Sequence, residues 1–233
     1  MNCTILQGDA LELLRTLPPE SVHTCVTSPP YYNLRDYGVE GQIGNEGSVE
    51  EYLQALVAVF REVRRVLHPN GTLWVTMGDS YATNSGNQPP TNTRNSCGHT
   101  AKRVPQGYKK KDLIGIPWQL AFALRADGWY LRQDIIWQKP NCMPESVNDR
   151  CTRSHEYIFL LSKSAHYYFN AAAKGLLFLF LYVMLDLCWI GAECVFEGIV
   201  HESRVDGVVL AWLCLLLVRE IDQFERKIRG DGR

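Results

Sequence analysis

The sequence predicts an α/β fold in which helices cover a parallel β-sheet. Short apolar runs typical of strands alternate with helical patterns from residue 3 to residue 77. Parallel neighbours need a crossover between them, usually a helix, so this alternation favours a parallel sheet. The 233 residues are enough for one domain with a full core. We therefore expect a main domain over residues 1–174, with a shorter region of different composition at 175–233.

The elements of the first half follow from apolar patterns and from the residues that end them. We expect a strand at 3–7, a helix at 9–17 that ends at Pro18-Pro19, and a strand at 22–27. Ser48 and Glu51 have the spacing of a capping box and predict the start of a long helix, which Pro69-Asn70-Gly71 ends. Its apolar residues recur at helical spacing: Tyr52, Leu53, Leu56, Val59, Phe60, Val63 and Leu67.

The second half continues with one strand, one helix and two further strands. A strand is expected at 72–77, and a helix at 116–127 with Pro117 in its first turn. Strands at 129–137 and from Ser154 to Phe159 follow. Between residues 80 and 111 lies a polar insert rich in Asn, Thr, Gly and Pro. A loop of this length in a compact domain is usually functional or disordered.

Composition restricts the classes of function. The net charge is −1, so overall charge does not indicate nucleic acid, and any DNA contact must be local. The eight Cys are scattered without a C-x-x-C pair, and Cys97 with His99 is the only close Cys/His pair. We therefore expect reduced thiols and no metal site. The first residues lack the basic and apolar layout of a signal peptide, which favours the cytoplasm.

The most informative motif follows the strand at 22–27. It reads Ser28-Pro29-Pro30-Tyr31, called here the 28–31 box. Proline fixes φ and has no N–H, so the chain leaves the sheet with preset carbonyls. The Ser28 hydroxyl and the Pro29 carbonyl can accept the two N–H bonds of an exocyclic base amine, and Tyr31 can stack on a base outside the duplex. The alternative is an ordinary exit from a strand with an exposed aromatic ring.

The 28–31 box resembles the catalytic box of amino-group DNA methyltransferases, particularly their cytosine-N4 branch. The adenine-N6 branch usually has Asp or Asn where Ser28 stands. The resemblance covers roughly residues 2–170 in family order. It includes Gln7-Gly8-Asp9, Leu34-Arg35-Asp36-Tyr37-Gly38, Gly41-Gln42-Ile43-Gly44, Gly78-Asp79, Gln138-Lys139-Pro140 and Ser154-His155-Glu156-Tyr157-Ile158-Phe159.

This resemblance implies a Rossmann-like, S-adenosyl-L-methionine-dependent methyltransferase fold in circularly permuted order. The methyl donor is S-adenosyl-L-methionine, the substrate is double-stranded DNA, and a cognate restriction enzyme is a further partner. Asp9 and Asp79 are candidate donor-binding carboxylates, or alternatively helix or turn caps. Tyr32 and Asn33 either line the base pocket or belong to a surface loop.

Two further sets of residues complete the predicted site. His155 and Glu156 stand at a strand start, where we expect a structural role. The insert has basic residues but no acidic residue between Asp79 and Asp112, which fits contact with DNA phosphates. The alternative is a solvated flexible loop. The basic residues are Arg94, Lys102, Arg103, Lys109, Lys110 and Lys111.

The region at 175–233 departs from the family pattern. The resemblance implies a donor-binding half with a glycine-rich turn, and this chain has no such sequence. Four interpretations stay open: a frame-shifted or recombined end, a divergent donor half with its strand at 182–186 and Gly191, a membrane-associated segment, or an apolar helical cover. Spanning is disfavoured because Asp186 interrupts the first Leu-rich run and the second covers only residues 208–218.

The missing donor half predicts a gap in the sheet. In the permuted fold, the strand with the glycine turn lies beside the strand at 22–27. An uncovered edge there would favour aggregation. The region at 175–233, called here the tail, or a partner must therefore fill the gap; otherwise the chain folds poorly. We expect a cytosine-N4 DNA methyltransferase that is incomplete or altered at its C-terminus. The rivals are an adenine-N6 enzyme, a DNA-binding remnant without a donor site, and a membrane-associated protein.

Overall fold

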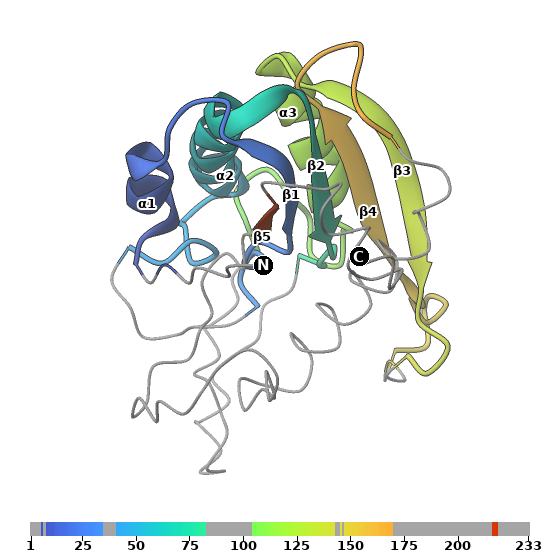
Figure 1. Cartoon of the computed structure of the whole chain (residues 1–233). Helices are drawn as coiled ribbons and strands as arrows, with labels where there is room; N and C mark the ends of the chain where they lie inside the picture. The colour runs from blue at the N-terminus through green and yellow to red at the C-terminus, as the bar shows by residue number, and fades with distance from the viewer. Residues whose placement is uncertain are drawn as a thin grey trace, which may run out of the picture.

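The computed structural model describes residues 6, 8–34, 41–82, 104–142, 145, 147–169 and 216–218. In this part of the chain, a sheet with the strand order β3-β4-β2-β1-β5 packs against helices (Figure 1), which confirms the α/β class. The helices are α1 (Ala10–Thr16), α2 (Val49–Val66) and α3 (Ile116–Ala126). The strands are β1 (Val22–Thr27), β2 (Leu67–Met77), β3 (Tyr130–Gln138), β4 (His155–Ser162) and β5 (Leu216–Val218).

The parallel pairing that the strand–helix–strand pattern predicts is confirmed for β1 and β2, but the sheet as a whole is mixed. Among the described strands only β1 and β2 pair in parallel, whereas β4 is antiparallel to both β2 and β3. The physical reason is that β3 and β4 follow each other without a helical pattern between them, and such strands pair as a hairpin. As a result β1, β2 and β3 all end at one edge of the sheet, and β4 begins there (Figure 1). We call this the strand-tip edge.

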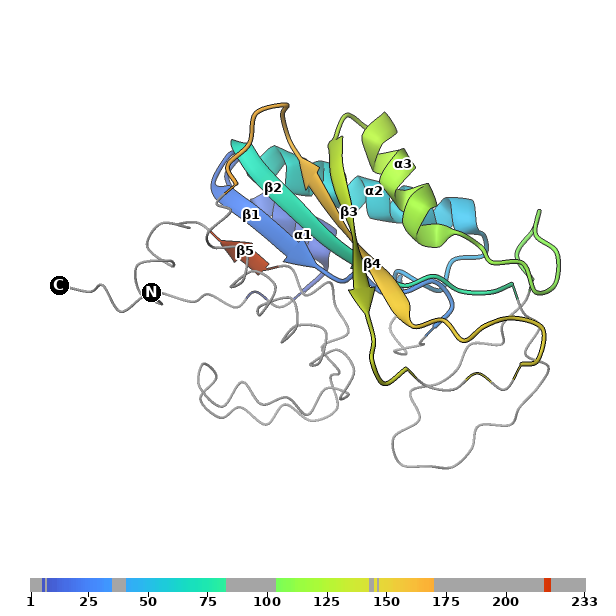
Figure 2. The same cartoon turned by 90° about the vertical axis from the view of Figure 1, so that its right-hand side faces the viewer.

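All three helices cover the same face of the sheet (Figure 2). The predicted capping box starts α2: Ser48 Oγ accepts a 3.1 Å hydrogen bond from the Glu51 N–H, and Glu51 Oε2 accepts one of 3.1 Å from the Ser48 N–H. The apolar residues of α2 then face the sheet as predicted. Its buried residues are Val49, Tyr52, Leu56, Val59, Phe60, Val63 and Val66.

The opposite face of the sheet carries a second, smaller apolar cluster. Its buried members are Val26, Trp74, Ile158 and Leu160. Because side chains alternate along a strand, Cys25 and Leu73 point into the helix-covered core while their neighbours point to this face. Burial on both faces explains the consecutive apolar residues at 73–75 in β2 and at 158–161 in β4.

One short strand of the tail lies beside β1. Leu216–Val218 pairs antiparallel with Thr24, Cys25 and Val26, which occupies part of the position where the sequence predicts a gap. Of the expected strand at 3–7 only Leu6 is described, and it is not in a strand; the remainder of the tail at 175–233 lies outside the described residues. Within the described ranges, no helix has both the length and the hydropathy that crossing a membrane requires.

Candidate active site

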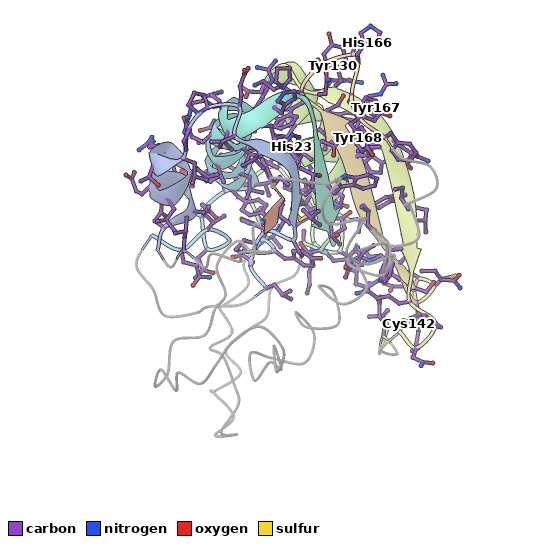
Figure 3. All side chains as sticks on the ribbon, viewed as in Figure 1. His23, Tyr130, Cys142, His166, Tyr167 and Tyr168 are labelled. Atoms are coloured by element: carbon purple, nitrogen blue, oxygen red, sulfur yellow. The ribbon has the colours of Figure 1, made fainter. Side chains whose placement is uncertain are left out.

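The 28–31 box lies at the strand-tip edge, directly after β1. Pro29 is buried, whereas Ser28, Pro30 and Tyr31 are half-buried. Figure 3 orients this edge: Cys142, shortly after β3, is at the bottom, and Tyr130, where β3 begins, is at the top. The box therefore places a hydroxyl, proline-held carbonyls and an aromatic ring at the end of β1, beside the end of β2, as the sequence predicts for a strand tip.

Tyr52 of α2 holds the box from the core side. Its hydroxyl donates a 2.7 Å hydrogen bond to the Pro30 carbonyl. Burial raises the pKa of Tyr52, so the hydroxyl stays protonated and remains a donor. We predicted Tyr52 only as part of an apolar helix face. A usable signal was present, because a buried tyrosine among aliphatic residues needs a polar partner for its hydroxyl.

The loop at residues 41–47 contacts the box from another side. The Asn33 N–H donates a 2.7 Å hydrogen bond to the Gly44 carbonyl. Gly44 has φ of +105°, and a Cβ there would lie 3.1 Å from the Tyr31 carbonyl oxygen, so both backbone and space favour glycine. Glu46 accepts from the Gly44 N–H at 2.8 Å, and partial burial raises the pKa of this carboxyl. The loop thus has a defined position against the box.

Tyr31 and Tyr32 point in different directions. The Tyr31 hydroxyl donates a 3.0 Å hydrogen bond to Glu156 Oε2 at the start of β4, and Glu156 Oε1 accepts from Lys139 Nζ. Tyr32 instead packs in the core with its ring centroid 5.3 Å from that of Tyr52. This burial contradicts the placement of Tyr32 in a surface loop, and its place in a base pocket stays a prediction. The contact between Tyr31 and Glu156 was missed, because no local pattern joins them.

The two predicted donor-side carboxylates both cap helices. Asp9 Oδ1 accepts from the Glu12 N–H at 3.0 Å and begins α1. Asp79 Oδ1 accepts from Gly115 N–H at 2.9 Å and Ile116 N–H at 3.0 Å, at the start of α3. These are the cap roles that the sequence left open. In the described part of the chain, no group of three or more His, Cys, Asp or Glu side chains could hold a metal ion.

The basic insert begins and ends next to Asp79. Ala82 N–H donates to the Asp112 carbonyl at 2.8 Å, and Ile114 N–H donates to the Ser80 carbonyl at 3.0 Å. The three lysines that precede Asp112 are all exposed, and the last of them, Lys111, pairs with Asp149. They are Lys109, Lys110 and Lys111. Three further predicted DNA-binding residues, Arg94, Lys102 and Arg103, lie outside the described residues.

Known proteins resemble this chain over the same region. Residues 22–176 match the model of the N6/N4 family described as DNA methylase. The type II methyltransferase M.Cfr9I of Citrobacter freundii is 54% identical over 171 residues, which are 72% of this chain and 57% of that protein. M.SmaI of Serratia marcescens is also 54% identical, over 72% of this chain and 59% of its own length. This chain thus spans less than two thirds of each relative.

Among solved structures, PvuII DNA methyltransferase (cytosine-N4-specific) is 21% identical and matches 69% of this chain and 49% of its own, with a TM-score of 0.47. A Thermus thermophilus protein described as a DNA modification methylase, complexed with S-adenosyl-L-methionine, is 25% identical over 70% of this chain and 54% of its own, with a TM-score of 0.46. The family match takes in more than half of the chain and includes the 28–31 box. The predicted resemblance is therefore confirmed, and the chain belongs to the N6/N4 DNA methylase family.

Proposed function

We propose that this chain carries the base-binding side of a DNA methyltransferase that transfers a methyl group from S-adenosyl-L-methionine to the exocyclic amine of cytosine. The observation that carries the proposal is the 28–31 box at the tip of β1, with the Pro30 carbonyl held by Tyr52 and the Tyr31 hydroxyl held by Glu156. An exocyclic amine is a poor nucleophile because its lone pair is delocalised into the ring. Two fixed acceptors can localise that lone pair.

Each residue of the box has a distinct task in this proposal. The flipped base stacks on Tyr31, and the amine donates its hydrogens to Ser28 Oγ and to the Pro29 carbonyl. The carbonyl of Pro30 already accepts from Tyr52, which helps to keep the adjacent peptide in place. When bound, the donor supplies an electrophilic methyl group. The amine loses its proton after attack, so positioning is required and a strong general base is not.

The described residues define the binding sites for the methyl donor and for DNA phosphates less completely than they define the 28–31 box. Both oxygens of Asp79 accept from the Gly115 N–H, so this carboxylate acts through α3 and fits poorly as a direct donor ligand. Asp9 uses Oδ1 as a cap, and we assign its Oδ2 to the donor side. We assign the six basic residues of the insert to DNA phosphates, because those described are exposed at the strand-tip edge.

The finer assignments rest on the resemblance of the box. Ser28 in place of Asp or Asn favours cytosine-N4 over adenine-N6 as the target amine. Curated relatives described as type II methyltransferases favour a restriction-modification context, with a cognate restriction enzyme and a place in the cytoplasm. We propose residues 1–174 as the catalytic domain, with its insert at 80–111, and residues 175–233 as a separate region.

The test is methyl transfer by the full chain to DNA that lacks methylated bases. The DNA is incubated with donor carrying a labelled methyl group, digested to nucleosides and analysed by mass spectrometry. We expect N4-methyldeoxycytidine. Ser28→Ala should lower kcat about a hundredfold, because one fixed acceptor at the reacting amine is lost. Ser21→Ala is a matched control at the other end of β1, where the hydroxyl bonds only the Pro18 carbonyl among the described residues.

The outcomes separate the candidates. N6-methyldeoxyadenosine would replace the proposed base by the adenine alternative. A folded chain that binds DNA with steep salt dependence, but neither binds the donor in calorimetry nor methylates DNA, is a DNA-binding remnant. Donor binding by the wild type and by Ser28→Ala alike, with kcat about a hundredfold lower in Ser28→Ala, supports the proposal.

A further inference from the structure

A connected set of side chains crosses the ends of four neighbouring strands at the strand-tip edge. Tyr31 follows β1, Glu156 lies near the start of β4, and β2 lies between these two strands in the sheet. The Tyr31 hydroxyl donates 3.0 Å to Glu156 Oε2. The Tyr31 side chain must therefore pass over the end of β2. Lys139, directly after β3, completes the set by its ion pair with Glu156.

Gly78 makes this crossing possible. It follows the last residue of β2, and a Cβ at this position would lie 2.6 Å from Cε2 of Tyr31 and 3.3 Å from Oε1 of Glu156. The first distance is far below van der Waals contact between carbon atoms. The φ of Gly78 is outside the left-handed region, so an alanine is allowed by the backbone there and is excluded only by the ring.

The sheet fixes the position of Glu156, the hydrogen-bond partner of Tyr31. In the ladders that flank β4, Glu156 is opposite Trp137 of β3, and its neighbour Tyr157 is opposite Met77 of β2. The Glu156 side chain is only 13% exposed and that of Lys139 is 25% exposed. The ion pair with Lys139 and the hydrogen bond from Tyr31 use different oxygens of the Glu156 carboxylate, so both contacts are made at the same time. A group on a strand holds its partner more tightly than a group on a loop would.

We propose that Glu156 is a positioning residue for methyl transfer, which sets the plane of the Tyr31 ring above Gly78 with the help of Lys139. This inference rests on the proposed function, in which Tyr31 stacks on the flipped base. Tethering the hydroxyl restricts the ring torsions before the base arrives, so less freedom is lost on stacking. The base amine then meets Ser28 and the Pro29 carbonyl in a fixed geometry.

Four variants of the full chain test the tether. Tyr31→Phe keeps the ring and removes its hydroxyl, Glu156→Ala removes the acceptor, and Glu156→Gln keeps an acceptor oxygen. We expect the first two to lower kcat about tenfold, with KM for S-adenosyl-L-methionine within about twofold of wild type, and Glu156→Gln to keep most of kcat. The double variant Tyr31→Phe/Glu156→Ala should be no slower than Glu156→Ala, because the two substitutions remove the same hydrogen bond.

A steric variant and two controls complete the set. Gly78→Ala should lower kcat at least as far as Tyr31→Phe, because the added methyl group displaces the ring. Tyr130→Phe removes a hydroxyl at the opposite edge (Figure 3), and Glu62→Ala breaks a half-buried ion pair with Arg65 on α2. Both controls should keep kcat within about twofold of wild type.

Ring motion gives a readout that does not depend on DNA. In protein with 13C-labelled tyrosine rings, the Tyr31 signals are identified by their loss in Tyr31→Phe. We expect slow ring flips in the wild type and in Glu156→Gln, and faster flips in Glu156→Ala. An unchanged flip rate of the Tyr31 ring in Glu156→Ala would show that Glu156 does not restrain the ring, and would overturn the proposal.

The kinetic outcomes separate this inference from the proposed function. Multiplicative losses in the double variant would make Glu156 merely structural, and would overturn the positioning role. Wild-type activity in Glu156→Ala, with a mobile ring, would overturn the positioning role while the proposed function stands. A wild-type chain that methylates no DNA overturns the proposed function and this role with it.

Discussion

Residues 28–34 and residues 104–115 both lie at the strand-tip edge of the sheet, but they are held in different ways. Side chains from α2 and β4 fix the first segment, through Tyr52 on Pro30 and Glu156 on Tyr31. The second segment is held by backbone bonds to residues 80–82 and by the Asp79 carboxylate, and its lysines are exposed. Chemistry at a base amine needs atoms fixed within fractions of an ångström, whereas attraction to phosphates acts over several ångströms.

The largest expected effect tests how the second segment is attached. Asp79→Ala should lower the free energy of unfolding by about 2 kcal/mol, because the N–H groups of Gly115 and Ile116 lose their acceptor. Urea unfolding followed by circular dichroism measures this. Asp9→Ala is the matched control and should cost about 1 kcal/mol or less, since this exposed carboxylate caps α1 through one N–H. Wild-type stability in Asp79→Ala together with lost donor affinity would contradict the cap and favour direct donor contact.

The next effect tests how the first segment is held. Tyr52→Phe should cost about 1.5 kcal/mol of unfolding free energy, because the Pro30 carbonyl loses a donor in a part-buried position. The same urea titration applies. Tyr130→Phe, whose residue is exposed, should stay within about 0.5 kcal/mol of wild type. Equal losses of unfolding free energy in the two variants would show that the hydrogen bond to Pro30 stabilises the fold no more than an exposed tyrosine hydroxyl does.

A third effect concerns the exposed lysines. Lys109→Gln combined with Lys110→Gln should weaken DNA binding roughly fivefold near 0.1 M salt and reduce the slope of log K against log salt by up to about 2. Fluorescence anisotropy of labelled duplex DNA over a salt series measures both quantities. Arg15→Gln on α1 is the control. An unchanged slope would remove these lysines from the phosphate contacts, and a fall in kcat would mean that the two segments are not separate in function.

The smallest effect concerns the loop beside the box. Burial raises the pKa of Glu46, so the folded chain binds a proton there more readily than the unfolded chain. The charged carboxylate therefore lowers stability at neutral pH, and this cost disappears as pH falls through the raised pKa. Glu46→Gln should stabilise the fold by less than about 1 kcal/mol near pH 7 after solvent screening, with no gain near pH 4. Urea titrations at several pH values measure this; a difference that grows at low pH would reverse the sign.

Local sequence patterns determined most of the elements. The capping box of α2, the exit from β1 at Pro29-Pro30 and the start of α3 at Pro117 each depend on residues within one or two helical turns of each other. Such signals need no partner from elsewhere in the chain, so they survive in the sequence alone. The direction of β4 could not be predicted from such local signals, because the pairing of strands depends on the connections between them.

By itself, the sequence determined that a hydroxyl, preset carbonyls and an aromatic ring stand together after β1, because these groups are consecutive. Only the tertiary structure decided what holds them. Tyr31 and Glu156 are 125 positions apart, Tyr52 and Pro30 are 22 apart, and Asp79 caps a helix that starts 37 positions later. The sheet order places β1, β2 and β4 side by side, and that order brings these distant residues within hydrogen-bond distance at a single edge.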